Sequence, residues 1–240
     1  MPDSLRGREI VLAGGTGGLG AATAELLAAE GARLVLSYRS NAARAAAWAG
    51  RATVLQADLA SAGDRRNLLD AAPSLYGLAI FAGNPARVPD PSALEQAMAR
   101  SWEINFAGPV LLAREAAARM RETSTPGAIV LLATMQAVAV FPGSTAYAAA
   151  KSALIQAARI LARECRGPAN IRVNVVAPGV TEAGMAEASI ASGKYDRFLE
   201  EGIVPRFGRA EDVARAVRFL LEPDNYITGQ VLSVDGGATL

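Results

Sequence analysis

Tyr147 and Lys151 are the two residues of this chain whose types and spacing best suit acid–base chemistry. They stand four apart in the run YAAAK, inside an alanine-rich stretch typical of a helix, and residues i and i+4 of a helix share one face, about 5–6 Å apart. A free tyrosine titrates near ~10, and a nearby ammonium moves the pKa of the phenol down, toward the range in which a general acid works best. The alternative is an ordinary helix in which Tyr147 packs and Lys151 is solvated, and other parts of the chain must decide between the two.

The composition restricts the chemistry further. The 240 residues include no histidine, which excludes a Ser-His-Asp triad, a Cys-His dyad and histidine-based metal sites. We predict no metal site, and Cys165 is the only cysteine, so no internal disulfide can form. The net charge of +1 favours neither nucleic acid nor an acidic membrane surface. No apolar run reaches the ~20 residues that cross a bilayer, and the N-terminus lacks the layout of a signal peptide, so we expect a soluble, cytoplasmic protein.

Segments typical of strands and helices alternate along the chain. Apolar runs predict strands at 8–13, 32–37, 52–57, 77–83, 127–134, 171–179 and 229–237. Helical spacing predicts helices at 18–31, 41–50, from 61, 92–120, 147–165 and 210–221. Several strands are almost continuously apolar, which fits parallel strands covered by helices on both faces. The sequence therefore predicts one domain over residues 1–240, a doubly wound, Rossmann-type α/β fold with a mostly parallel seven-stranded sheet.

The stretch around 181–208 is the least regular part of the chain. It follows the carboxyl end of a predicted strand, where sheets of this kind bind ligands, and we expect it to form a substrate lid. Its apolar side chains favour an apolar pocket: Met185, Ile190, Tyr195 and Phe198.

A glycine-rich loop, AGGTGGLG (Ala13–Gly20), joins the first predicted strand to the first predicted helix. It fits both G-x-G-x-x-G and G-x-x-x-G-x-G, and either spacing alone would be weak. At a helix N-terminus, however, backbone N–H groups and the helix dipole favour a phosphate, and glycine lets it approach closely. A tight turn without a ligand is the alternative. We predict that the loop binds a dinucleotide through Gly14, Thr16, Gly18, Leu19 and Gly20.

The end of the second predicted strand indicates the form of the cofactor. NAD sites usually hold the ribose hydroxyls with an acidic residue about 20 residues downstream of the loop. Here the stretch reads LSYRSN, with Tyr38 in the likely acidic position, then Arg39 and Ser40. An arginine beside hydroxyl groups suits a 2′-phosphate, whereas a solvated surface arginine is the alternative. We therefore predict NADP(H).

Together these features resemble the short-chain dehydrogenase/reductase family. The resemblance covers nearly the whole chain, and the order and spacing of the motifs are more specific than any one motif. The motifs are the glycine loop, ADL (Ala57–Leu59), FAG (Phe81–Gly83), Asn105 in WEINFAG, YAAAK (Tyr147–Lys151), NVVAPG (Asn174–Gly179) and ITGQVLSVDGG (Ile227–Gly237). Within the family the chain is most similar to the 3-oxoacyl-[acyl-carrier-protein] reductase group.

The resemblance implies roles for individual residues. Tyr147 would protonate the carbonyl oxygen as hydride arrives, Lys151 would bind the nicotinamide ribose and lower the pKa of the tyrosine, and Asn105 would help anchor a water in a proton relay. Asp58 and Leu59 would contact the adenine, and Ala82 and Gly83 would line the cofactor. The nicotinamide would be bordered by Pro178, Gly179 and the backbone of Thr181.

Thr134 is the main departure from the family pattern. The family has a serine on the fifth strand, and counting back 13 residues from Tyr147 reaches Thr134. Its hydroxyl can still donate to a substrate oxygen, although the extra methyl stiffens χ1 and crowds the pocket. A β-favouring strand residue with no catalytic role is the alternative. Elsewhere, Asp64, Arg65 and Arg66 are predicted to form a solvated helix face.

The predicted function is that of an NADP(H)-dependent oxidoreductase that interconverts a ketone and a secondary alcohol, with a 3-oxoacyl thioester as one candidate substrate. A dinucleotide-binding sensor or scaffold of the same fold is the first rival, and a lyase or epimerase with bound NAD(P) is the second. The expected partners are a small carbonyl or alcohol substrate, free or on an acyl carrier, and other copies of the chain in a homodimer or homotetramer. Neither nucleic acid nor a membrane is expected as a partner.

Overall fold

The computed structural model describes residues 4–88 and 90–240. Its strands are β1 (Glu9–Ala13), β2 (Arg33–Tyr38), β3 (Thr53–Gln56), β4 (Leu75–Ile80), β5 (Gly127–Leu132), β6 (Ile171–Pro178) and β7 (Val231–Val234). They form one sheet in the order β3-β2-β1-β4-β5-β6-β7, and every pairing is parallel. The predicted doubly wound α/β fold is confirmed, with a sheet that is wholly rather than mostly parallel. The strand order reverses direction between β1 and β4, which is where open sheets of this kind form a ligand crevice.

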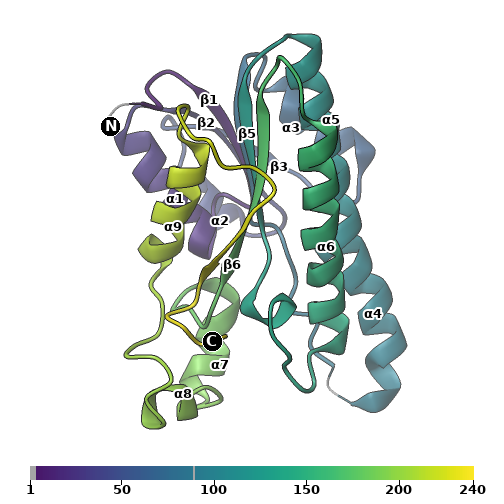
Figure 1. Cartoon of the computed structure of the whole chain (residues 1–240), viewed down its shortest axis with the longest axis vertical. Coiled ribbons are helices and arrows are strands. Elements are labelled where there is room, and N and C mark those ends of the chain that lie inside the picture. The colour runs from purple at the N-terminus through teal and green to yellow at the C-terminus, as the bar shows by residue number, and fades with distance from the viewer. Residues whose placement is uncertain (1–3, 89) are drawn as a thin grey trace.

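Helices cover both faces of the sheet (Figure 1). One layer holds α1 (Gly18–Ala29), α2 (Ala42–Ala46) and α9 (Ala210–Leu221). The other layer holds α3 (Ala62–Asp70), α4 (Leu94–Trp102), α5 (Gly108–Glu122) and α6 (Thr145–Glu164). The short helices α7 (Glu187–Ala191) and α8 (Arg197–Glu200) lie beyond the carboxyl end of β6 (Figure 1). No helix in the described part of the chain combines the length and the apolar character needed to cross a bilayer.

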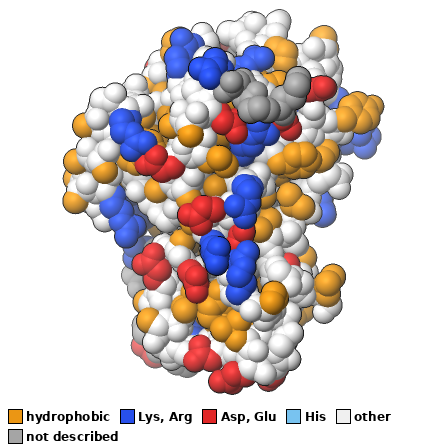
Figure 2. Space-filling model, turned by 90° about the vertical axis from the view of Figure 1, so that its left-hand side faces the viewer, with side chains coloured by type: hydrophobic (Ala, Val, Ile, Leu, Met, Phe, Trp, Pro, Cys, Tyr) orange, Lys and Arg blue, Asp and Glu red, His pale blue; other side chains and the backbone are white. Residues whose placement is uncertain are grey.

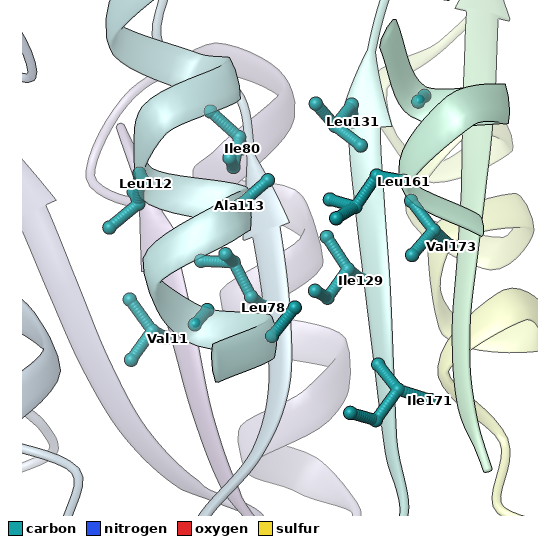
Figure 3. Packing of buried hydrophobic residues seen from close by; sticks show 14 of the residues in the cluster. Val11, Leu78, Ile80, Leu112, Ala113, Ile129, Leu131, Leu161, Ile171 and Val173 are labelled. Atoms are coloured by element: carbon teal, nitrogen blue, oxygen red, sulfur yellow. The ribbon is translucent and has the colours of Figure 1, made fainter. Parts of the chain in front are cut away.

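The apolar residues of the strands explain the two helical layers. Side chains alternate along a strand, so Ile10 and Leu12 of β1 join the core beneath α1 and α9, while Val11 joins the core beneath α5 and α6. Figure 3 shows the second core, in which Leu112 of α5 and Leu161 of α6 cover the central strands. Because both faces are buried, the strands read as continuous apolar runs.

Mixed charges mark the outer surface of the α1 and α9 layer. Basic and acidic side chains are intermixed down this face (Figure 2). Arg218 of α9 joins the two helices through an ion pair from its Nε to Glu30 Oε1, at 2.8 Å. This mixture agrees with a net charge of +1.

The helix predicted over 92–120 is interrupted in its middle. Between α4 and α5 the chain makes a π-helical turn, Glu103–Ala107. Such turns hold one residue more than an α-helical turn and are frequent at functional sites. Here the turn carries the fully buried Asn105, whose bonds belong to the site described next.

Candidate active site

A cleft of about 1040 Å³ lies at the carboxyl edge of the sheet. That volume suits a cofactor together with a small substrate. Of the predicted site residues, those lining the cleft are Gly14, Thr16, Gly18, Leu19, Gly20, Arg39, Ser40, Asp58, Leu59, Ala82, Gly83, Thr134, Tyr147, Lys151, Pro178 and Thr181. The structure thus brings together residues that are far apart in the sequence. Asn105 and Gly179 are the two predicted site residues outside the lining.

The glycine loop has the shape that a phosphate site requires. Gly14 has a φ of +81°, and a Cβ on it would lie 2.9 Å from the backbone nitrogen of Ala82. The Ser37 hydroxyl accepts a hydrogen bond from the Gly14 nitrogen at 3.0 Å, which holds the loop at the end of β1. Helix α1 then starts at Gly18 with no side chain capping its N-terminus, so its first N–H groups are available to an anion. These residues fit a dinucleotide phosphate.

Two arginines lie at the far end of the cleft, beyond β2. Arg39 and Arg44 both line the cleft and are exposed. The Nη1 of Arg44 lies 3.8 Å from the position of a Cβ on Gly17. Neither arginine forms an ion pair within residues 4–88 and 90–240. Sequence reasoning missed Arg44, although Asn41 is a recognisable N-cap whose Oδ1 accepts from the Arg44 nitrogen at 3.0 Å and so starts the short helix that carries it.

The loop that follows β3 is held from behind by a buried arginine. Arg65 was predicted to be solvated, and that prediction was wrong, because only 5% of its surface is exposed. It donates to the Leu59 carbonyl at 2.7 Å and to Glu115 of α5 at 3.0 Å. A Cβ on Gly108 would lie 2.9 Å from Leu59 Cβ, so α5 approaches this loop closely. The backbone at Asp58 and Leu59 is thereby fixed at the cleft wall.

Helix α6 brings Tyr147 and Lys151 to the centre of the cleft. Lys151 is 3% exposed, and its Nζ donates to the Leu132 carbonyl at the end of β5, at 2.7 Å. Burial lowers the pKa of Lys151 to about 8. Burial, followed by the nearby Tyr195 phenol, raises the pKa of Tyr147 to about 12, and a hydrogen bond with Thr134 opposes that rise. The expected lowering of the phenol pKa by Lys151 is therefore not found in this structure.

Thr134 stands where the missing serine was expected. It follows β5, lines the cleft beside Tyr147 and keeps 9% of its surface exposed. Its Oγ1 accepts a hydrogen bond from the backbone nitrogen of Gln136 at 3.3 Å. The hydroxyl thus keeps its own hydrogen for another acceptor.

Asn105 lies behind the cleft wall. Its Oδ1 accepts from the Asn84 nitrogen at 2.8 Å, and its Nδ2 donates to the Asn84 carbonyl and the Ser101 hydroxyl, both at 2.9 Å. A Cβ on Gly83 would lie 3.1 Å from Asn105 Oδ1 and 3.7 Å from Lys151 Nζ. Asn105 is thus close to Lys151, but one of its amide hydrogens holds the chain after β4 and the other is bonded to Ser101 of α4. Its side-chain N–H groups are not free to anchor a relay water.

Gly179 also serves the frame rather than the lining. A Cβ there would lie 2.7 Å from the Cα of Asp235, beyond β7. The next turn fixes the start of the irregular segment, because Thr181 Oγ1 donates to the Gly179 carbonyl at 3.1 Å and Thr181 pairs with Gly208.

The irregular segment between Thr181 and Gly208 closes one side of the cleft. A Cβ on Gly18 would lie 3.1 Å from the Cα of Gly184, so this segment meets the glycine loop directly. Of its four apolar residues named as possible pocket residues, Met185 and Tyr195 line the cleft, whereas Ile190 and Phe198 do not. The lining also includes Lys194 of this segment and Arg87 of the loop after β4, which sequence reasoning missed.

Within the described residues, no three acidic or cysteine side chains gather as possible metal ligands. Cys165 is buried, and its burial raises the pKa of the thiol.

Known proteins share both the sequence pattern and the fold. The family model described as enoyl-(acyl carrier protein) reductase matches residues 13–239. A 3-oxoacyl-[acyl-carrier-protein] reductase of Rattus norvegicus is 34% identical, over 95% of this chain and 96% of that protein. An NADPH-dependent aldehyde reductase-like protein of Arabidopsis thaliana is 31% identical, over 98% and 96%. The crystal structure of the NADPH-dependent 3-quinuclidinone reductase of Rhodotorula rubra matches with a TM-score of 0.84 and 26% identity, over 99% and 93% of the two chains.

Proposed function

Because the chain belongs to the short-chain dehydrogenase/reductase family of oxidoreductases, we propose that it interconverts a ketone and a secondary alcohol with NADP(H). The observation that carries the proposal is the meeting of Tyr147, Thr134 and Lys151 in one cleft with the glycine loop. The named activities of the three similar proteins differ in substrate. We therefore take only the reaction class from these proteins, and we infer the substrate class from the residues that line the cleft.

The preference for NADP(H) rests on charge. Arg39 and Arg44 stand without an acidic partner at the end of the cleft where the ribose of the adenosine would lie, and paired guanidinium groups suit a phosphate. Two of the similar proteins are named as NADPH-dependent. The glycine loop, Asp58, Leu59, Ala82 and Gly83 would hold the rest of the cofactor.

The proposed proton donor is Tyr147. A bound nicotinamide cofactor supplies the hydride, which leaves negative charge on the substrate oxygen. With its pKa at about 12, Tyr147 keeps its proton at neutral pH. It can still give that proton to an alkoxide, because the alcohol that forms is a weaker acid, about as weak as water, whose pKa is ~15.7. The Thr134 hydroxyl, with its own hydrogen available, would orient and polarise the same oxygen.

Lys151 would act from behind the tyrosine. Its pKa of about 8 leaves it mainly protonated at neutral pH. Its charge would stabilise the phenolate that Tyr147 becomes after donating its proton. Only one of its three N–H groups has an acceptor within the described residues, so the others are available to ribose hydroxyls.

The test is turnover by the native protein and by the Tyr147→Phe variant on a panel of ketones that includes a 3-oxoacyl thioester. We expect Tyr147→Phe to lose about 10³-fold in kcat, within the range that general acids supply, while NADPH still binds and the melting temperature holds. Equal activity in the two proteins would refute the mechanism. NADPH binding without turnover of any ketone by the native protein would support the sensor or scaffold instead.

We also propose that residues 1–240 act as one domain, in which Thr181–Gly208 forms a lid over the cleft. We further propose that the chain forms a homodimer or homotetramer. Three helices of one layer expose large apolar side chains: Leu94, Met98 and Trp102 of α4, Leu111 of α5 and Ile160 of α6. An apolar face of this kind favours contact with another protein surface. Light scattering after gel filtration tests the assembly, and a monomer at micromolar concentration would refute it.

A further inference from the structure

We propose that the substrate carries a negatively charged group, which Arg87 and Lys194 hold at the mouth of the cleft. The inference rests on the proposed function and adds the substrate class, a ketone with an acidic group a few bonds from its carbonyl. Charge, position and the absence of a competing carboxylate support it in turn.

Charges are distributed unequally along the cleft. The charged residues of its lining are Arg39, Arg44, Asp58, Arg87, Lys151 and Lys194. Asp58, the one acid among the described residues that line the cleft, lies at the end that carries Arg39. Next to it, Gln56 Nε2 donates to the Arg39 carbonyl at 2.9 Å, which ties the ends of β2 and β3 together. The part of the lining around Tyr147 therefore holds cations and no carboxylate.

Arg87 and Lys194 come from different segments but meet at one residue. Arg87, from the loop after β4, donates from Nη2 to the Ser189 hydroxyl at 3.4 Å and to the Met185 carbonyl at 3.3 Å. The backbone nitrogen of Lys194 donates to the Ser189 carbonyl at 3.2 Å. The Arg87 guanidinium and the backbone of Lys194 are thus held at the same turn of the lid.

This turn lies close to the proposed reaction centre. The Nζ of Lys194 is 5.6 Å from the centroid of the Tyr195 ring, and Tyr195 lines the cleft with Tyr147. The two phenols are near enough for Tyr195 to raise the pKa of Tyr147. An anion beside Lys194 would therefore lie within a short chain of atoms from a carbonyl at Tyr147.

The acids of the lid lie outside the cleft lining: Glu182, Glu187, Asp196, Glu200 and Glu201. Glu187 Oε1 accepts from the Gly184 nitrogen at 2.7 Å, and Asp196 Oδ2 lies 2.9 Å from the position of a Cβ on Gly193. Neither acid lines the cleft. Within residues 4–88 and 90–240, no carboxylate pairs with Arg87 or Lys194, so their charges are available to a substrate anion.

The test compares ketones whose acidic group is charged or masked as a methyl ester, namely acetoacetate with its methyl ester and levulinate with its methyl ester. With NADPH, we expect the native enzyme to prefer each acid by about tenfold in kcat/KM, as charge-assisted hydrogen bonds supply, and the preference to shrink as salt rises. Lys194→Gln and Arg87→Gln should each reduce turnover of the acids and leave the esters unchanged. Lys194→Glu should reverse the preference.

Arg159→Gln is the matched control, because Arg159 is an exposed arginine of α6 outside the cleft. This substitution should change the turnover of neither the acids nor the esters. Equal turnover of acids and esters by the native enzyme would overturn the inference and leave the proposed function standing, as would equal losses on both substrates in the Lys194 and Arg87 variants. No turnover of any ketone would remove both proposals.

Discussion

The two edges of the sheet use buried polar side chains in opposite ways. At the amino edge, Tyr76 of β4 and Arg172 of β6 are buried beneath the end of α9. Arg172 donates to the carbonyls of Leu220 and Glu222 at 2.9 and 2.7 Å, and Tyr76 donates to the carbonyl of Leu221 at 2.7 Å. The last carbonyls of a helix have no partner within the helix, so these two side chains cap it from below.

At the carboxyl edge, the polar groups beside the cleft keep hydrogen-bond donors that the fold does not use. Lys151 is as buried as Arg172 but donates to a single backbone carbonyl, that of Leu132. Tyr147 and Thr134 open onto the cleft. The difference teaches that burial alone does not mark a functional residue. A buried donor that caps helix carbonyls far from the cleft supports the fold, whereas one that retains hydrogens beside the cleft is placed for chemistry.

The largest expected effect on stability comes from a substitution at the amino edge of the sheet. Arg172→Met leaves the carbonyls of Leu220 and Glu222 without donors, and each buried unpaired acceptor costs roughly 1–3 kcal/mol, so we expect a loss of about 4 kcal/mol in the free energy of unfolding. Urea denaturation measures it. Below the transition, the folded variant should keep the native KM for NADPH.

Tyr76→Phe is the control for this cluster, since it keeps the ring and removes only the hydroxyl, which donates to the Leu221 carbonyl at 2.7 Å and accepts a long bond from Arg172 at 3.5 Å. Its expected cost is about 1–2 kcal/mol. A change in KM for NADPH without a change in stability, in either variant, would contradict the division between the two edges.

Thr134 tests the carboxyl edge of the sheet, where a substitution should reduce activity and leave stability nearly unchanged. Thr134→Val keeps the shape and removes the hydroxyl, which should cost about 10²-fold in kcat, the lower end of the range for a lost oxyanion donor. Unfolding should change by no more than about 1 kcal/mol, because the bonds lost are the weak one from the Gln136 nitrogen and the one with the Tyr147 phenol, which opens onto the cleft. Thr134→Ser restores the hydroxyl and should retain native activity within a few-fold. Equal kcat in the Val and Ser variants would refute a catalytic role for the hydroxyl.

The sequence could predict elements and motifs whose signal is local. The apolar runs marked all seven strands, and the glycine loop with YAAAK marked the centre of the cleft. Strand ends were placed too late at β4, β5, β6 and β7, by up to three residues. After β4 and β5 the first residues that leave the sheet are still apolar, so the sequence does not mark the end of the strand. The segments that follow β4 and β5 line the cleft, whereas Gly179, which follows β6, does not.

Long-range pairings could not be predicted from the sequence. Arg65 looked solvated because its partner Glu115 lies 50 residues away. Asn105 carried a family motif, but its hydrogen bonds depend on a π-helical turn that helical spacing does not reveal. Arg44 was missed because its approach to Gly17 arises only when α2 folds beside the glycine loop.

The pH dependence of stability sharpens the comparison, because a functional buried charge should destabilise the fold. The pKa of Lys151 is about 8, below its ordinary value of 10.5. Below pH 8 both the folded and unfolded states are protonated, and the full cost of burying the charge is present. Between pH 8 and 10.5 the unfolded state binds more protons, so the stability of the native protein rises with pH. Lys151→Met, which removes this titration, should therefore lose about 2 kcal/mol of stability relative to the native protein between pH 7 and pH 9.5.

Parallel urea titrations of the two proteins measure that difference. Tyr147 is neutral in the folded state over this range, because its pKa rises to about 12. Its partial ionisation in the unfolded state is the same in both proteins, so it cancels from the difference. A constant difference between native protein and variant at both pH values would show that Lys151 is not held as a buried charge.

The smallest expected effects come from substitutions of the two exposed arginines at the carboxyl edge of the sheet. Arg39 and Arg44 contact no carboxylate within the described residues, so replacing either with alanine should leave the free energy of unfolding unchanged. Each change should weaken NADPH by about tenfold, the value of one charge-assisted contact, and should leave NADH unchanged, since NADH lacks the 2′-phosphate. Isothermal titration with both cofactors measures this, with Arg159→Ala as the control for loss of surface charge. Equal losses for NADPH and NADH in Arg44→Ala would place its guanidinium on the phosphates that the two cofactors share, at the glycine loop, and would leave the choice of NADP(H) to Arg39.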